Sequence, residues 1–260
     1  MDIPQLILVG LIMFAASTVQ SAVGFAFTLF ALPFLLLVGL TLPEAVAVTI
    51  LSSAIQRIIA VSYLRHAVDW QLIKPMIFYG VAMLPVGTLV LREVTFLSPH
   101  TAKQIIGVVI LLTLLSQWFG NLKPRESVHC SWGYLAGAVS GFLTGFANIG
   151  GPPIVLWILA HRWSNERMRI MASIFTLSFV PFQLIILPIV FGKPVLTAYV
   201  SAIPVSPMVV AGSWCGLKVG SRIHGKHLRL TMQIILLVIA LVSLLKPLLG
   251  SPGENVPGAF

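Results

Sequence analysis

Charged residues and cysteines are both scarce in this chain. Only 9% of its 260 residues are charged, whereas soluble domains carry roughly 25%, so a soluble protein is excluded. The two cysteines, Cys130 and Cys215, lie far apart in the sequence and have no companion ligands beside them. Neither a disulfide framework nor a zinc site is therefore indicated.

Recognisable catalytic motifs are also lacking. The sequence contains no plausible Ser-His-Asp arrangement, no paired carboxylates, no HExxH and no P-loop, so we expect no enzyme activity, no cofactor and no bound metal. The hydrophobic segments carry no carboxylate apart from Glu44 and Glu166, which are expected at helix starts. A proton relay through buried acids is therefore disfavoured. The histidines fall at segment ends or in loops, where a solvated role is expected: His66, His100, His129, His161, His224 and His227.

Long hydrophobic runs make up most of the chain. Hydrophobic residues account for 58% of it, and the mean hydropathy is +1.00. About 20 apolar residues cross a bilayer as one helix, so we predict an all-α polytopic membrane protein with roughly eight hydrophobic segments. The polar tail, 250–260, is predicted to be disordered. The segments are expected at 6–42, 44–63, 72–91, 101–119, 132–160, 168–191, 196–219 and 228–248.

Two of these segments are too long for one crossing and contain a polar, glycine-bearing interruption. The first interruption is 20–24 and the second is 145–153. Their matching places predict two internal repeats, each opening with a broken or re-entrant helix, as in transporters with the substrate site near the breaks. We assign repeat one to 1–120, a connecting loop to 121–130 and repeat two to 131–249. Superposing the halves aligns 24–26 with 145–147, Glu44 with Glu166, Gly87 with Gly216, and 104–106 with 233–235.

The distribution of basic residues predicts a topology. If both broken segments are re-entrant hairpins, basic residues gather on one side, which the positive-inside rule makes cytoplasmic. Both termini then lie outside an inner (plasma) membrane, and three spans plus one hairpin per repeat make the repeats inverted. The alternative is eight plain spans with a weak charge bias. The richer side carries Arg65, Lys74, Lys123, Arg125, Arg162, Arg167, Arg169, Lys218, Arg222, Lys226 and Arg229, and the other side carries Arg92, Lys103, Lys193 and Lys246.

The second interruption has the composition of an anion site. The two glycines and two prolines of 150–153 predict a turn followed by a helix N-terminus. Backbone amides and the helix dipole at such a terminus attract anions, and Asn148 and Thr144 would add side-chain donors. The alternative is a packing kink, in which the helix approaches a neighbour closely through small residues: Gly137, Gly141 and Gly145.

Arg57 lies inside the second hydrophobic segment. An intramembrane arginine is costly and marks a functional site by default, and no acidic residue of the segments is available to neutralise it. An anionic substrate would neutralise it; the alternative is that Arg57 snorkels toward the cytoplasmic end of its helix. The predicted substrate-binding residues are Gln20, Ser21, Gly24, Thr28, Ser52, Ser53, Arg57, Thr144, Asn148, Gly150, Gly151 and Pro152.

The whole chain resembles a known family, and two stretches carry the resemblance. The stretch 24–33 (GFAFTLFALP) and the stretch 140–153 (SGFLTGFANIGGPP) are similar to the opening motifs of the two halves of the TauE/SafE-type sulfite exporters, also called TSUP transporters. Phe27, Thr28 and Leu29 stand where the fullest form of the first motif has further glycines. The resemblance implies small sulfur-containing anions or organic acids as substrates, such as sulfite, sulfoacetate or other sulfonates.

The combined prediction is a membrane transporter that exports small sulfur-containing or organic anions. An inside-negative potential favours anion export by about 2.3 kcal/mol per charge per 100 mV. The expected partners are a small anionic substrate and the lipid bilayer, with a possible homo-oligomer and no nucleic acid. The alternatives are a non-transporting membrane scaffold or assembly factor, and an anion channel.

Overall fold

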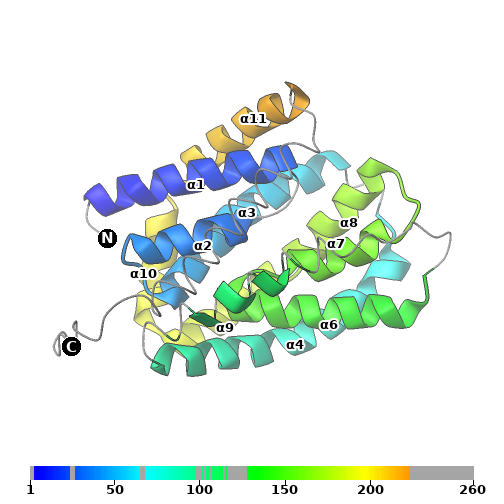
Figure 1. Cartoon of the computed structure of the whole chain (residues 1–260), viewed down its shortest axis with the longest axis horizontal. Helices are drawn as coiled ribbons and strands as arrows, with labels where there is room; N and C mark the ends of the chain where they lie inside the picture. Colours follow the sequence, from blue (N-terminus) through cyan, green and yellow to red (C-terminus); the bar gives the residue numbers. More distant parts are fainter. Residues whose placement is uncertain are drawn as a thin grey trace.

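The fold is a set of packed helices (Figure 1). The computed structural model describes residues 3–23, 27–64, 68–97, 101, 104–105, 107–109, 111–113, 115 and 128–222. The predicted tail, the eighth segment, most of the connecting loop and Gly24 lie outside these residues. The helices are α1 (Ile3–Val23), α2 (Phe27–Leu37), α3 (Leu42–Leu64), α4 (Trp70–Phe96), α6 (Cys130–Ala147), α7 (Gly151–Leu159), α8 (Asn165–Leu177), α9 (Val180–Phe191), α10 (Lys193–Ala202) and α11 (Ser206–Arg222).

Several of these helices are built to cross a bilayer. Within the described residues, Ile3–Ser21, Trp70–Phe96 and Arg167–Phe191 are each long and apolar enough to span a membrane. A fourth span is made if Lys193–Ala202 and Ser206–Gly216, which are bent by 55°, count as one. Large apolar side chains such as Phe78 and Ile189 stand exposed on the surface, where lipid rather than water suits them. The chain is therefore a multi-pass helical membrane protein, as its composition predicts.

The first long segment is a helical hairpin. Near its tip, the Gln20 side-chain oxygen accepts the N–H of Phe27 at 3.0 Å. Near its open end, Gln5 Nε2 donates to the Val38 carbonyl at 3.4 Å. These two bonds show that α2 runs back along α1. The predicted interruption is placed slightly too early, because 20–23 complete the last turn of α1.

The second long segment is a hairpin of the same kind. Ser140 Oγ accepts the N–H of Ile154 at 3.1 Å. The Trp157 ring, further along α7, lies against Gly133, which is nearer the start of α6. Helix α7 therefore runs back along α6 (Figure 1). At about 1.5 Å per residue, the 11 residues of α2 and the 9 residues of α7 each cover about half of a ~30 Å hydrocarbon core.

A left-handed residue makes the turn of the second hairpin. Asn148 has a φ of 56° and a ψ of 30°, and it is the C-cap of α6. Asparagine tolerates this conformation better than other residues with a side chain. Its N–H and that of Ile149 return to the carbonyls of Thr144 (2.8 Å) and Leu143 (3.1 Å). Gly150 then caps α7, with proline in its first turn, as the glycine and proline pattern predicts.

Close glycine contacts join two pairs of helices, α4 with α6 and α1 with α11. A Cβ atom on Gly141 would collide with the Gly80 carbonyl oxygen of α4, and one on Gly137 would lie 2.6 Å from the Met76 carbonyl oxygen. In the other pair, a Cβ on Gly212 or Gly216 would collide with carbonyl oxygens of α1. The packing role considered for the glycines of α6 is thus confirmed, and it coexists with the break in the same helix.

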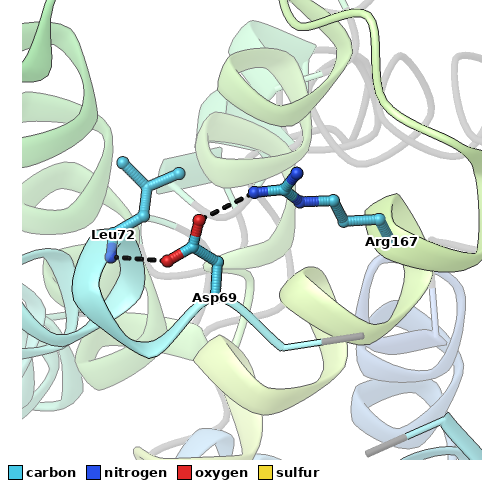
Figure 2. Close-up of polar contacts among 3 residues, drawn as sticks. All are labelled: Asp69, Leu72 and Arg167. Carbon is cyan, nitrogen blue, oxygen red and sulfur yellow. Dashed lines mark hydrogen bonds and ion pairs between the residues drawn. The ribbon is translucent and has the colours of Figure 1, made fainter. Parts of the chain in front are cut away.

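Polar contacts fix the ends of α3, α4 and α8. Glu44, at the start of α3 as predicted, accepts bonds from the N–H and O–H groups of Thr41 at 2.8 and 2.7 Å. Figure 2 shows Asp69 capping α4 through the N–H of Leu72 and receiving Arg167 Nη2 from α8 at 2.7 Å. Arg167 is therefore occupied by a structural ion pair.

His161 is buried, so the solvated role predicted for it is wrong. Its ring stacks on Trp163, with centroids 4.4 Å apart, and its edge meets Trp157 at the same separation. The side chain is 8% exposed, and its Nδ1 lies 2.9 Å from the Trp157 carbonyl oxygen. Trp157 and Trp163 belong to no recognisable motif, so the sequence does not predict this stack.

Replacing Gly141 by alanine tests the α4–α6 contact. Because the added methyl meets backbone that cannot rotate away, Gly141→Ala should lower the free energy of unfolding by about 1–3 kcal/mol. Gly151→Ala is the matched control, since nothing lies within 4 Å of its added Cβ, and it should change stability by less than about 0.5 kcal/mol. Equal thermal stability of both variants in detergent would contradict the close contact.

Candidate anion-binding cavity

A polar cavity of about 180 Å³ lies where the two hairpins, α3 and α8 meet. The first residues of both α2 and α7 belong to its wall, so two helix N-termini face one space. None of the described residues that line it is acidic. The lining is Gln20, Ser21, Phe27, Thr28, Leu29, Gln56, Arg57, Asn148, Ile149, Gly151, Pro152, Ile154, Val155, Arg169, Ala172, Ser173 and Thr176.

Seven of the twelve predicted binding residues lie on this wall. They come from four helices and from the turn that follows α6, and their shared feature is a position at or facing a helix break: Gln20, Ser21, Thr28, Arg57, Asn148, Gly151 and Pro152. Ser52, Ser53, Thr144 and Gly150 are not among the lining residues, and Gly24 lies outside the described residues.

Asn148 connects the two hairpins across the cavity. Its side-chain amide donates to Thr28 Oγ1 on α2 at 3.3 Å and to Thr49 Oγ1 on α3 at 3.4 Å. All three side chains are buried. The residue that turns the second hairpin therefore also attaches it to the first, and an anion entering here would meet this amide.

Arg57 carries a positive charge on the wall from the second half of α3. Its Nη1 donates to Ser53 Oγ at 2.9 Å, and Ser53 in turn donates to the Ile50 carbonyl at 3.1 Å. A neutral hydroxyl positions the guanidinium but does not neutralise it. Ser53 thus acts on the site through Arg57, rather than by facing the cavity itself.

Thr144 and Gly150 support the turn from behind. The Thr144 hydroxyl donates to the Ser140 carbonyl at 2.6 Å, and a Cβ on Gly150 would collide with Thr144 Oγ1. The Thr144 carbonyl accepts Gln183 Nε2 from α9 at 3.0 Å. These contacts give both residues a packing role in the second hairpin.

The N-terminus of α7 offers fewer amides than an ordinary helix. Pro152 and Pro153 have no N–H, and the N–H of Ile154 is held by Ser140 Oγ. In the same way, the first N–H of α2, at Phe27, is held by Gln20. Gly151 also lines the cavity, and its N–H is the remaining amide of this first turn that neither proline nor Ser140 removes. Side chains therefore supply most of the donors.

Four lining polar residues were missed by the sequence prediction: Gln56, Arg169, Ser173 and Thr176. The last three, with Ala172, follow a spacing of three and four residues along α8, which places them on one helix face. That spacing was a usable signal. The sequence analysis predicts Arg169 only as a cytoplasmic charge and does not include Gln56, which lies beside Arg57, among the binding residues.

A helical membrane protein with a polar cavity between two discontinuous helices has the architecture of a secondary transporter. The family model described as Sulfite exporter TauE/SafE matches residues 9–243. The chain therefore belongs to the TauE/SafE family, a family of membrane transporters rather than enzymes. No curated protein and no solved structure matches it.

Two substitutions separate the backbone role of Asn148 from its side-chain role. Glycine adopts the left-handed conformation freely, whereas alanine pays about 1–2 kcal/mol for it. The free energy of unfolding of Asn148→Ala should therefore be about 1 kcal/mol lower than that of Asn148→Gly, although both variants lose the same side-chain amide. Denaturant unfolding in detergent measures the difference, and equal stabilities of the two variants would show that the left-handed turn constrains nothing.

Proposed function

We propose that this chain exports small sulfur-containing or organic anions, such as sulfite, sulfonates and sulfoacetate, across the inner (plasma) membrane. The observation that carries the proposal is the cavity at the two helix breaks, where Arg57 faces polar neighbours and no lining carboxylate. Membership of a sulfite exporter family supports the substrate class. No catalytic group or cofactor is required, because the work is binding and a change of access.

The anion would bind between Arg57 and Asn148. Arginine presents a planar array of donors that suits the oxygens of a sulfite, sulfonate or carboxylate group. The Asn148 amide would exchange one of its two long bonds, to Thr28 or Thr49, for a bond to the anion. The N–H of Gly151 and the polar groups of Gln20, Ser21 and Thr28 would complete the shell. Gly24, Ser52, Ser53, Thr144, Gly150 and Pro152 would then shape the site or hold its ligands in place.

The size of the cavity favours a small substrate. Pockets for drug-sized ligands have volumes of about 300–1,000 Å³, whereas this cavity holds about 180 Å³. A nucleotide or a sugar phosphate exceeds that space. Anions of one or two carbon atoms, or inorganic oxyanions, fit it.

Paired contacts support the two internal repeats, 1–120 and 131–249. Gln56 Nε2 reaches the Ser17 carbonyl of α1 at 3.4 Å, and Gln183 Nε2 reaches the Thr144 carbonyl of α6 at 3.0 Å. Each glutamine thus crosses to the first helix of its own half. Likewise, each first helix packs closely against a later helix of the other half, α1 on α11 and α6 on α4.

The hairpins favour the inverted topology over eight plain spans. In Figure 1, α1 begins at the left-hand end, where α9 also meets α10, while α6 begins at the right-hand end, where the α7–α8 connection lies. The two hairpins therefore open in opposite directions. With the right-hand end cytoplasmic, the start of α6 lies inside and the start of α1 lies outside, which agrees with the topology predicted from charge. Opposed hairpins around one cavity suit alternating access, and an inside-negative potential favours export of an anion.

Loss of the Arg57 charge tests the proposal. Labelled sulfite flux into proteoliposomes should fall at least about tenfold in Arg57→Gln, because an unpaired anion in a low-dielectric site costs several kcal/mol. Arg92→Gln is the control, since Arg92 is an exposed arginine outside the cavity, and it should keep the native flux. Equal flux in both folded variants would contradict an anion site at Arg57.

The dependence of the flux on sulfite concentration distinguishes a transporter from an anion channel or a non-transporting scaffold. A transporter saturates at modest sulfite concentration, while a channel carries a current that does not. A scaffold shows neither flux nor selective thermal stabilisation by anions. A ligand at a hundred times its Kd should stabilise the transporter by about 2.7 kcal/mol.

Cys130 provides a native probe of the orientation. It is an exposed free cysteine at the start of α6, which the topology places on the cytoplasmic side. In a Cys215→Ser background, a membrane-impermeant maleimide should label Cys130 in inside-out vesicles and leave it unlabelled in right-side-out vesicles. The opposite labelling would reverse the topology and place both termini inside.

A further inference from the structure

The cavity lining includes a second cation, which is carried by α8, a helix that packs against α3. Arg169 lines the cavity from α8 and is itself exposed, so the cavity reaches the surface at this residue. Arg57, in the second half of α3, is half-buried and so lies deeper than Arg169. The two guanidinium groups therefore stand at different depths along one space.

Among the side chains that the structure describes, no acidic group neutralises either charge. Arg167, two residues before Arg169, is paired with Asp69 (Figure 2). Among the described residues, Arg169 has no such ion pair and no side-chain hydrogen bond, and Arg57 is bonded only to the neutral hydroxyl of Ser53. The described lining includes no carboxylate. Two positive charges thus share a small cavity, which raises the local concentration of anions and favours the more highly charged ones.

We infer that Arg169 is a second anion contact at the mouth of the cavity, and that the substrate carries two negative charges. The inference rests on the proposed function and narrows it. A dianion neutralises both arginines at once, whereas a monoanion leaves one charge unpaired in the occupied cavity. Sulfite dianion and sulfoacetate meet this requirement, and a simple monosulfonate does not.

Ser173 and Thr176, which lie on the same face of α8 as Arg169, make the cavity mouth polar but do not donate hydrogen bonds to the anion. The Ser173 hydroxyl donates to the Arg169 carbonyl at 2.7 Å, and the Thr176 hydroxyl donates to the Ala172 carbonyl at 2.7 Å. Both hydroxyl protons are therefore engaged within the helix. Selection by charge at this end falls to the Arg169 guanidinium.

Ethanesulfonate and ethanedisulfonate form a matched pair of probes, because they differ by one permanently charged sulfonate. Their Kd values follow from thermal stabilisation of the purified protein over a range of concentrations. The native protein should bind ethanedisulfonate at least about tenfold more tightly than ethanesulfonate, a coupling of the size found for close charge pairs. Arg169→Gln should bring this ratio close to one, while the Kd for ethanesulfonate changes less than about threefold.

Two further variants control the test. Arg162→Gln removes an exposed charge from the adjoining α7–α8 connection, outside the cavity lining, and should keep the native ratio. Arg169→Lys keeps the charge and should retain a preference for the disulfonate. A parallel loss of affinity for both probes in Arg169→Gln, or a native ratio near one, would overturn the inference.

The same data distinguish failure of this inference from failure of the proposed function. If the native protein binds both sulfonates equally well, the second contact is absent and the anion site remains. If neither sulfonate nor sulfite stabilises the folded native protein, the anion site itself is contradicted.

Discussion

The left-handed turn at Asn148 is the constraint on which the site depends. It ends α6, sends α7 back along it and brings the start of α7 to the cavity. Irregular backbone at membrane depth is tolerated only where protein buries it or where it lines a polar space. Both conditions are met here, because the Asn148 amide bonds to Thr28 and Thr49 of the first half while the turn itself faces the cavity. One residue thus sets the backbone path and joins the two hairpins.

Glycine contacts hold the hairpins in place around that turn. Helix α6 lies against α4, and α1 lies against α11, at distances that leave no room for a Cβ atom. Within the membrane, helix association depends on such close packing because lipid tails are as apolar as the side chains. The cavity receives residues from both interlocked pairs.

The sequence predicted the helices well, because apolar runs of bilayer length have few alternatives. Apart from the segment 101–119, much of which lies outside the described residues, the segment bounds from 6 to 219 agree with the observed helices to within a few residues, and the break before α7 follows from its glycines and prolines. Half of the site was also readable, since Arg57 and Asn148 are unusual residues inside apolar runs. Arg169 was missed because a basic residue near a membrane surface is common, and only tertiary packing turns it toward the cavity. The burial of His161 between Trp157 and Trp163 likewise depends on packing that no local pattern records.

The central claim is that an anion binds between the two helix breaks. The most direct measurement is an experimental structure of the protein soaked with selenite, whose selenium scatters anomalously and whose shape matches sulfite. The account predicts one strong anomalous peak within hydrogen-bond distance of the Arg57 guanidinium and the Asn148 amide. A peak bound elsewhere in the membrane region, with this cavity empty in a protein that transports sulfite, would contradict it.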